Sequence, residues 1–372
     1  FKYISYYEVK PKNLKNSLVS DKFFTNLSTS EIFDFIITFP FIGVMFLEMG
    51  WSCSRYVKII AVIGTIFTLD YVGIFKHYHE LDYERYFDYP SGPPSEYNYK
   101  FINNPSGKCK VPPKLIIIIK SAAENVLRRN TIRRTWGYEQ RFSDVEIRRV
   151  FLLGISEDIK INTISKNESL KFNDIVQIDF IDAYFNNTIK TFMGMKWALS
   201  HCNSEFFFFV DDDYYVSTKN LLKYISNPDL YPKTDPNSRI TGNEKNELFS
   251  GFVLQTPPHR HKFSKWYVPL SEYPFDLWPP YITAGAFVLN RNALLKLFNA
   301  GSHLKRFRFD DIFLGIAALK ANLTLKHCEM FYFNKPKYEG PTSYQYIVAS
   351  HGFQNGKELE TIWNECRSAG FA

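Results

Sequence analysis

The sequence predicts an α/β fold with a mainly parallel sheet, because short apolar runs alternate with stretches of helical length. Short runs that are wholly or mainly apolar occur at 115–119, 150–153, 175–180 and 206–210. Runs of this kind are typical of strands that are covered on both faces. The stretch 187–200 between the last two runs has an apolar face at helical spacing. Alternation of this kind indicates parallel strands joined by crossover helices, with ligands bound beyond the carboxyl ends of the strands.

Composition supports a globular protein, and its modest positive charge suits a small anionic ligand. The chain has 372 residues, 45% hydrophobic and 22% charged, which excludes a wholly disordered chain, a collagen and a coiled coil. The formal net charge is +7, but the basic residues are spread along the chain without a long basic block. We therefore expect no nucleic-acid partner.

The first 108 residues predict a membrane-targeted amino terminus rather than a part of the main domain. The stretch 56–75 is predicted as a transmembrane signal anchor, with a buried core helix or a cleaved signal peptide as the alternatives. Arg55 and Lys58 favour a cytoplasmic side before it, so that residues 109–372 would be lumenal. Residues 76–108 are rich in Tyr, Pro, Gly and charge and predict an exposed stem. Residues 1–55 are predicted as a tail, of which the part before Met49 is expected to lie outside the natural chain.

The cysteines agree with a lumenal location. Four of the five follow the predicted anchor, at positions 109, 202, 328 and 366, so two disulfides are possible, although sequence alone does not give their pairing. The sequence has no CxxC pair, and a zinc site is therefore not expected.

Three consecutive acids, Asp211, Asp212 and Asp213, follow the apolar run 206–210 directly. Adjacent carboxylates repel one another unless a cation neutralises them. Carboxylate oxygens suit a hard divalent ion such as Mn²⁺ or Mg²⁺, which would stabilise a departing diphosphate. The alternative is a solvated acidic turn.

Two further charged motifs lie where ligand-facing loops are expected. Arg129, Arg133 and Arg134 follow the first predicted strand and could bind phosphate, or could simply form the surface of a helix start. Asp310 and Asp311 precede an apolar helical stretch, where one could cap the helix while the other serves as a general base.

Three more residues are weaker candidates. Trp278 and Tyr281 lie in an aromatic, proline-rich segment that could stack against an acceptor sugar, with a packed loop as the alternative. His351 follows an apolar stretch and could bind a metal, although a lone histidine is usually structural.

Taken in order, these motifs resemble the β-1,3-galactosyltransferase / β-1,3-N-acetylglucosaminyltransferase family, glycosyltransferase family 31. The resemblance covers roughly residues 109–366 and rests on Arg-x-x-x-Arg-x-Thr-Trp-Gly from Arg129, Phe-Leu-Leu-Gly at 151–154, Lys190-Thr191, the three acids at 211–213, Pro-Pro-Tyr at 279–281 and Asp-Asp-Ile at 310–312. The family usually has Glu-Asp-Val at the last motif and often has cysteine where Ile282 stands. These departures remove no charge that the chemistry needs, but they leave the sugar open.

The resemblance implies a GT-A fold, a type II Golgi membrane protein, and inverting transfer from a UDP-sugar, with Mn²⁺ or Mg²⁺, to a 3-hydroxyl of an acceptor glycan. The residue roles that it implies are a catalytic base at Asp311, metal ligands at Asp213 and His351, donor contacts at Arg129, Arg133, Lys190, Asp211 and Asp212, and an acceptor contact at Asp310 beside Trp278 and Tyr281. A catalytically silent glycan-binding relative and a retaining transferase are the alternatives.

Overall fold

The computed structural model describes residues 55–93, 97–232 and 247–372. The chain divides into two compact units. The described part of the smaller unit comprises residues 55–86 and 257–277, and the larger unit holds the remainder. The predicted tail, 1–55, lies outside the described residues except for its last residue.

The larger unit is built on a mixed sheet of eight strands. These strands are β1 (Phe101–Asn103), β2 (Leu115–Lys120), β3 (Ile147–Ile155), β4 (Ile175–Ile181), β5 (Phe206–Asp211), β7 (Phe249–Leu254), β8 (Tyr281–Asn290) and β9 (Lys326–His327). Their order across the sheet is β1-β4-β3-β2-β5-β8-β7-β9. The four strands from β2 to β5 run parallel to one another, whereas β8 is antiparallel to both β5 and β7. The four predicted runs are therefore confirmed as a parallel set.

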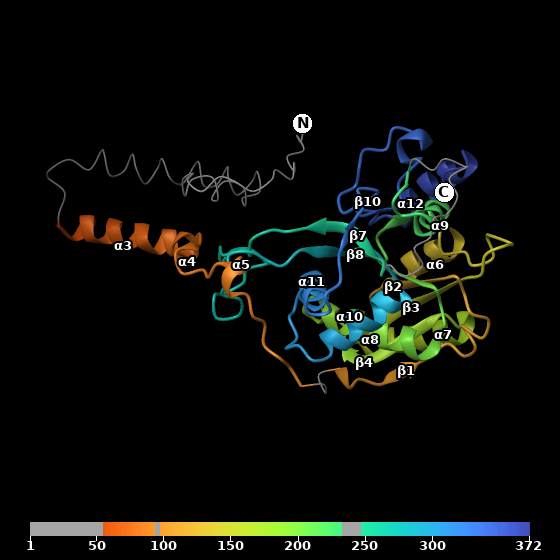
Figure 1. Ribbon diagram of the computed structural model, residues 1–372, viewed down its shortest axis with the longest axis horizontal. Helices are drawn as coiled ribbons and strands as arrows, with labels where there is room; N and C mark the ends of the chain where they lie inside the picture. Colours follow the sequence, from red (N-terminus) through yellow and green to blue (C-terminus); the bar gives the residue numbers. More distant parts are fainter. Residues whose placement is uncertain (1–54, 94–96, 233–246) are drawn as a thin grey trace. The chain divides into compact units, whose positions relative to one another are not determined.

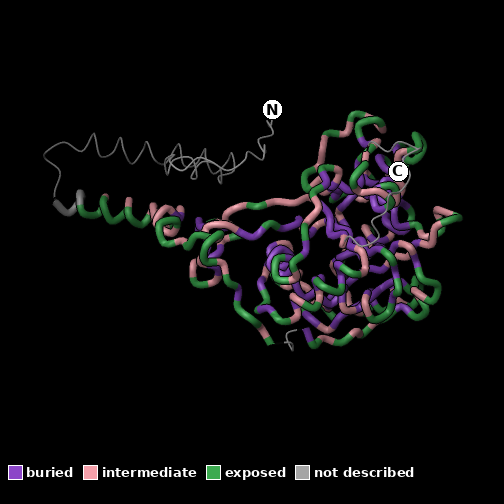
Figure 2. The backbone as a smooth tube through the Cα atoms, viewed as in Figure 1, coloured by how far each residue is buried: buried purple, intermediate pink, exposed green. Residues whose placement is uncertain are grey.

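Helices cover both faces of this sheet, as expected for strands that are mainly apolar. The helices of the larger unit are α6 (Val126–Arg134), α7 (Ile159–Phe172), α8 (Asn187–His201), α9 (Thr218–Ser226), α10 (Arg291–Gly301), α11 (Asp310–Lys320) and α12 (Gly356–Ser368). Helices α8, α10 and α11 lie together, and α6 lies against α12 in a separate group (Figure 1). The strands between these groups form the buried interior (Figure 2).

Helix α8 approaches the sheet closely because it carries a glycine at the contact. A Cβ atom built on Gly194 would lie 2.3 Å from Cδ1 of Leu152 on β3, too close for any larger residue without a shift. Helix α8 agrees with the helix predicted for 187–200.

A second sheet of three short strands brings the carboxyl-terminal part of the chain to the acidic motif. It consists of β6 (Tyr215–Val216), β10 (Phe331–Tyr332) and β11 (Ala349–Ser350), in the order β10-β11-β6. Ser350 pairs with Tyr215 in an antiparallel register. His351 directly follows β11 and Asp213 lies just before β6, so this pairing places them beside each other.

The predicted stem, 76–108, overlaps the larger unit. The larger unit begins at Phe87, and residues 101–103 form β1, which pairs with β4 of the main sheet. The apolar rings of Tyr97 and Phe192 stack with their centroids 4.8 Å apart, which helps to hold this segment against α8. The boundary is difficult to predict because a single three-residue edge strand carries little periodic signal.

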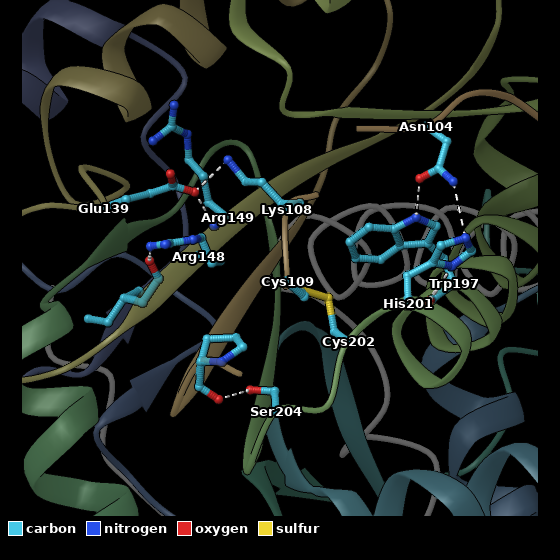
Figure 3. The surroundings of a disulfide bond; sticks show 12 residues. Asn104, Lys108, Cys109, Glu139, Arg148, Arg149, Trp197, His201, Cys202 and Ser204 are labelled. Carbon is cyan, nitrogen blue, oxygen red and sulfur yellow. Dashed lines mark hydrogen bonds and ion pairs between the residues drawn. A yellow bond between two sulfur atoms is a disulfide. The ribbon is translucent and has the colours of Figure 1, made fainter. Parts of the chain in front are cut away.

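A disulfide joins Cys109, just before β2, to Cys202 at the end of α8 (Figure 3). Beside it, Asn104 accepts a hydrogen bond of 2.8 Å from the indole of Trp197 and also contacts His201. Cys328 and Cys366 are buried and free, so one of the two disulfides that the cysteine count allowed is present.

The smaller unit contains α3 (Arg55–Tyr71), α4 (Ile74–His77) and α5 (Tyr83–Tyr86). Arg260 is buried there; its Nε atom lies 2.7 Å from Glu80 and it donates to the carbonyls of Val268 and Tyr273. The predicted anchor, 56–75, falls mainly on α3. Within the described ranges, no helix has both the length and the apolar character needed to cross a membrane.

Candidate active site

Three consecutive carboxylates at the carboxyl end of β5 point to three different parts of the chain. Asp211 is the last residue of β5, and it is followed by Asp212 and Asp213. Lys120, the last residue of β2, stands in register with Asp211 on the neighbouring parallel strand. The acids therefore lie at the sheet edge where an α/β fold binds its ligands, as the sequence predicted.

Asp212 is directed into the protein and is fully engaged by the segment that follows β2. Its carboxylate accepts hydrogen bonds from the Ser121 hydroxyl at 2.6 Å, the Asn125 amide at 2.9 Å and the Arg128 guanidinium at 2.8 Å. A buried carboxylate with three donors of this kind is a structural anchor. Asp212 thus holds the start of α6 against the acidic motif.

Asp213 and His351, both predicted as metal ligands, lie together. Nε2 of His351 is 3.3 Å from a carboxylate oxygen of Asp213, and the amide of Gln354 donates to the same oxygen at 2.9 Å. Burial alone would raise the pKa of Asp213, but the hydrogen bond to His351 and the positive charges of His351 and Arg128 together outweigh it, so that the pKa is lowered. The same hydrogen bond raises the pKa of His351. In the described part of the chain, no group of three or more His, Cys, Asp or Glu side chains forms a metal site.

Asp211 is paired with a buried lysine that the sequence analysis did not single out. Nζ of Lys120 lies 3.0 Å from Asp211, 3.0 Å from Asp310 and 2.9 Å from the carbonyl oxygen of Ala284. Burial by itself would lower the pKa of Lys120, but the two carboxylates overcome that effect and raise it. Burial raises the pKa of Asp211 to about 6, and Lys120 opposes part of this rise.

Asp310 and Asp311 form the first turn of α11, as the sequence predicted, but their environments differ. Asp310 accepts hydrogen bonds from Lys120 and, at 3.0 Å, from the Thr191 hydroxyl. It is therefore directed toward the sheet, whereas we predicted it as an acceptor contact. The carboxylate of Asp311 accepts a bond of 2.8 Å from the Ile312 amide.

The pKa of Asp311 suits a group that exchanges a proton near neutral pH. Burial raises this pKa from 3.8 to about 7, with a further contribution from the adjacent charge of Asp310. A carboxyl that titrates near pH 7 can accept a proton and release it again under physiological conditions.

Arg129 and Arg133, predicted as donor contacts, are held inside the protein by acids from later in the chain. Arg129 is fully buried, and its guanidinium binds Glu168 of α7 and the carbonyl oxygens of Ala122 and Ala123. Arg133 pairs with Glu168 at 2.7 Å and with Asp174 at 2.8 Å. Their charges are thus already neutralised by protein, and Arg129 braces the turn after β2.

Arg128, which the prediction passed over, is the arginine nearest to the acidic motif. Besides binding Asp212, it hydrogen-bonds the side chain of Gln354, and 24% of its side chain is exposed. Its position next to Arg129 in sequence gave no way to tell which of the two points to the acids. Lys190, predicted as a donor contact, is buried and binds Asp182 and the carbonyl of Ser121 at the same sheet edge.

Trp278 and Tyr281 are buried and do not offer open ring faces to a sugar. Trp278 is 4% exposed and packs edge-on against Phe307, with ring centroids 5.5 Å apart. Tyr281 is 7% exposed, and its hydroxyl lies 3.0 Å from that of Thr256. The alternative of a packed segment therefore describes this region better. Tyr281 is the first residue of β8 and packs closely against Gly315 of α11.

Comparison with known proteins assigns the family. The sequence model of the galactosyltransferase family, Galactosyl_T, matches residues 127–329, more than half of the chain, from within α6 to beyond β9. The chain belongs to the galactosyltransferase family. Together with the relatives described next, this result confirms the predicted membership in the β-1,3-galactosyltransferase / β-1,3-N-acetylglucosaminyltransferase family and the prediction of a hexosyltransferase.

Relatives in this family match nearly the whole chain. Beta-1,3-galactosyltransferase brn of Drosophila melanogaster is 50% identical over 331 residues, which cover 85% of this chain and 97% of the relative. Beta-1,3-galactosyltransferase bre-5 of Caenorhabditis elegans is 34% identical, with 84% and 94% covered. Among solved structures, galactosyltransferase LgtC in complex with donor and acceptor sugar analogs aligns with 67% of this chain and 95% of its own, at 11% identity and a TM-score of 0.35.

Proposed function

We propose that this family member is an inverting β-1,3-hexosyltransferase of GT-A type that moves galactose or an N-acetylhexosamine from a UDP-sugar to the 3-hydroxyl of an acceptor glycan. The observation that carries the proposal is Asp311, a carboxyl with a pKa of about 7 at the start of α11, next to the acidic end of β5. The names of the relatives, both beta-1,3-galactosyltransferases, favour galactose as the sugar.

Asp311 acts as the general base. Its ionised carboxylate accepts the proton of the acceptor hydroxyl while that oxygen attacks the anomeric carbon, and the bond from this carbon to the diphosphate breaks on the opposite face. One displacement of this kind inverts the anomeric centre. Asp310 and Lys120 hold the first turn of α11 against the sheet while this occurs.

The residues present fit a divalent cation, Mn²⁺ or Mg²⁺, at Asp213 and His351. Five carboxylates, at 211–213, 310 and 311, lie in these two acidic motifs, and the permanent cations that pair with them are Lys120 and Arg128. Surplus negative charge of this kind favours a bound cation. When bound, the ion would supply charge stabilisation for the departing diphosphate.

The donor diphosphate would contact Arg128 rather than Arg129 or Arg133. Arg128 combines partial exposure with contact to the acidic motif, whereas the other two are occupied by Glu168 and Asp174. We propose that Arg129 and Lys190 support donor binding indirectly, by fixing the turn at 121–123, and that Arg133 does so by holding Glu168, the partner of Arg129. Asp211 and Asp212 likewise shape the donor side through Lys120 and Arg128.

We also propose that the larger unit works in the lumen of the Golgi. The disulfide between Cys109 and Cys202 supports an oxidising compartment, since disulfides are rare in the cytosol. The type II membrane arrangement stays a prediction.

A donor screen tests the proposed activity. The full chain, produced in a secretory host, is incubated with UDP-galactose, UDP-N-acetylglucosamine, UDP-N-acetylgalactosamine or UDP-glucose, with Mn²⁺ or EDTA and an array of acceptor glycans. Transfer from one donor, lost in EDTA and giving a β-linked product, supports the proposal. A folded protein that binds UDP but transfers nothing to any acceptor contradicts it, and an α-linked product contradicts inversion.

A further inference from the structure

Lys120 has an arrangement that is unusual for a buried lysine. Only 4% of its side chain is exposed, and the three protons of its ammonium group have three acceptors, Asp211, Asp310 and the Ala284 carbonyl, at 3.0, 3.0 and 2.9 Å. These acceptors come from β5, α11 and β8. One side chain at the end of β2 thus connects three other elements at the sheet edge.

The connection to α11 is the important one, because Asp310 and Asp311 are neighbours in the first turn of that helix. A hydrogen bond from Thr191 of α8 holds the same oxygen of Asp310 that Lys120 binds. With Asp310 fixed from two sides, the backbone of the next residue is fixed as well. The carboxyl of Asp311 is then held at a set place relative to the acids at the end of β5.

A gain in stability does not by itself explain why the charged side chain of Lys120 is buried. A buried ion pair gains little over apolar groups of similar volume, because both charges lose their hydration. A lysine in this position is better explained by what it does to the groups around it.

We propose that Lys120 is a positioning residue for the transfer reaction: its ammonium group ties the base-bearing turn of α11 to the acidic end of β5. The inference rests on the proposed function, in which Asp311 is the base. It adds a residue that touches neither donor nor acceptor in this scheme and acts through Asp310 and through its charge.

The charge of Lys120 provides a readout that a purely structural role would not move. The charged side chains that act most strongly on Asp311 are Asp310, on its own helix, which raises the pKa, and Lys120, from β2, which lowers it. Helix α8 contributes the uncharged Thr191 to this group, and β8 contributes the carbonyl of Ala284. Removal of the Lys120 charge should therefore raise the pKa of Asp311.

The test compares Lys120→Met and Lys120→Arg with the wild-type full chain. We expect Lys120→Met to lower kcat by about 10²-fold, because small displacements of a catalytic group have effects of that size. We expect its UDP affinity to fall far less. The acid limb of its pH–rate profile should move up by about one pH unit. Lys120→Arg keeps the charge and should leave that limb at the wild-type pH.

Lys108→Met is the matched control. Lys108 is also largely buried and pairs with a carboxylate, Glu139, but that pair lies beside the amino-terminal part of β3, at the opposite end of the parallel strands. This variant should keep the wild-type pH profile. If Lys120→Met keeps the wild-type limb and kcat, or if Lys108→Met shifts the limb equally, the proposal is overturned.

Two further measurements test the proposal if Lys120→Met does not fold or if the wild-type chain shows no transfer. If Lys120→Met does not fold, Thr191→Val, which loses one bond to Asp310, should lower kcat in the same direction by a smaller factor, and an unchanged kcat would overturn the proposal. If the wild-type chain transfers no sugar, the proposed function fails. Thermal unfolding then still tests whether Lys120 and Asp310 interact. Asp310→Asn should lower the melting temperature of the Lys120→Met variant less than it lowers that of the wild type. Equal decreases in the two proteins would show that the two side chains do not interact.

Discussion

Replacement of Asp311 by asparagine should remove transfer and leave the fold intact. The side chain keeps its size, and its amide oxygen can still accept the Ile312 N–H that Asp311 accepts at 2.8 Å. The lost group is the proton acceptor, and general-base catalysis contributes about 10²–10⁴-fold. We expect kcat to fall by about this factor while the dissociation constant for UDP stays near that of the wild type.

The same replacement should not destabilise the protein above neutral pH. In the folded chain the pKa of Asp311 is raised from 3.8 to about 7, which means that folding disfavours its charged form. The penalty is absent below pH 3.8, grows as the pH rises toward 7 and is complete above it. A change of this size corresponds to a few kcal/mol, on the order of 4. Asp311→Asn carries no such penalty, so its melting temperature at pH 8 should equal or exceed that of the wild type.

The assay combines a pH–rate profile with melting curves at pH 5 and pH 8. Wild-type kcat/KM should rise with pH to a plateau, with an acid limb near pH 7, and at pH 6 it should be about a tenth of the plateau value, since about a tenth of the base is ionised there. The reasoning is refuted if Asp311→Asn retains wild-type turnover. It is refuted equally if the folded variant no longer binds UDP.

Three other changes test separate parts of the structure. Asp213→Ala should weaken Mn²⁺-dependent UDP binding, measured by calorimetry with and without EDTA, because it removes the carboxylate beside His351; unchanged binding would count against a metal site there. Arg129→Met should lower stability by about 3–5 kcal/mol in urea titrations, because it leaves Glu168 with one cation fewer; lost UDP binding without lost stability would instead indicate direct phosphate contact. Cys109→Ser should lower stability by about 2–5 kcal/mol, since the bond to Cys202 closes a long loop, and an unchanged melting temperature would argue against that bond.

The strands that carry the site were predictable because their sequences fit a buried strand and no other element. A run such as 206–210, four phenylalanines and a valine, is too short for a helix and too apolar for a surface. The position of the three acids at its end followed directly. The place of Asp310 and Asp311 in a first helical turn was predictable in the same way, from the apolar stretch that follows them.

The partners of individual charges were not predictable, because they come from residues far along the chain. Arg129 and Arg133 look like phosphate ligands until Glu168 and Asp174, about 40 residues later, are placed beside them. The sequence contains both acids, but nothing in their spacing says that they face these arginines. Lys120 was missed for the related reason that it ends an apolar strand, where a lysine usually reaches solvent.

The three adjacent acids show why such a motif needs three residues rather than one. Asp211 is bound by Lys120 and so belongs with α11; Asp212 is bound by Arg128 and so belongs with α6; Asp213 lies beside His351 and so belongs with the carboxyl-terminal strand β11. Asp212 accepts three hydrogen bonds from protein, and Asp211 has a buried cation, which leaves Asp213 as the acid whose neighbours are an imidazole and an amide. Each carboxylate therefore fixes one wall of the site, and the last remains for the ligand. A substitution at Asp212 should accordingly disturb α6 and Arg128 first, and binding of a cation at Asp213 only through them.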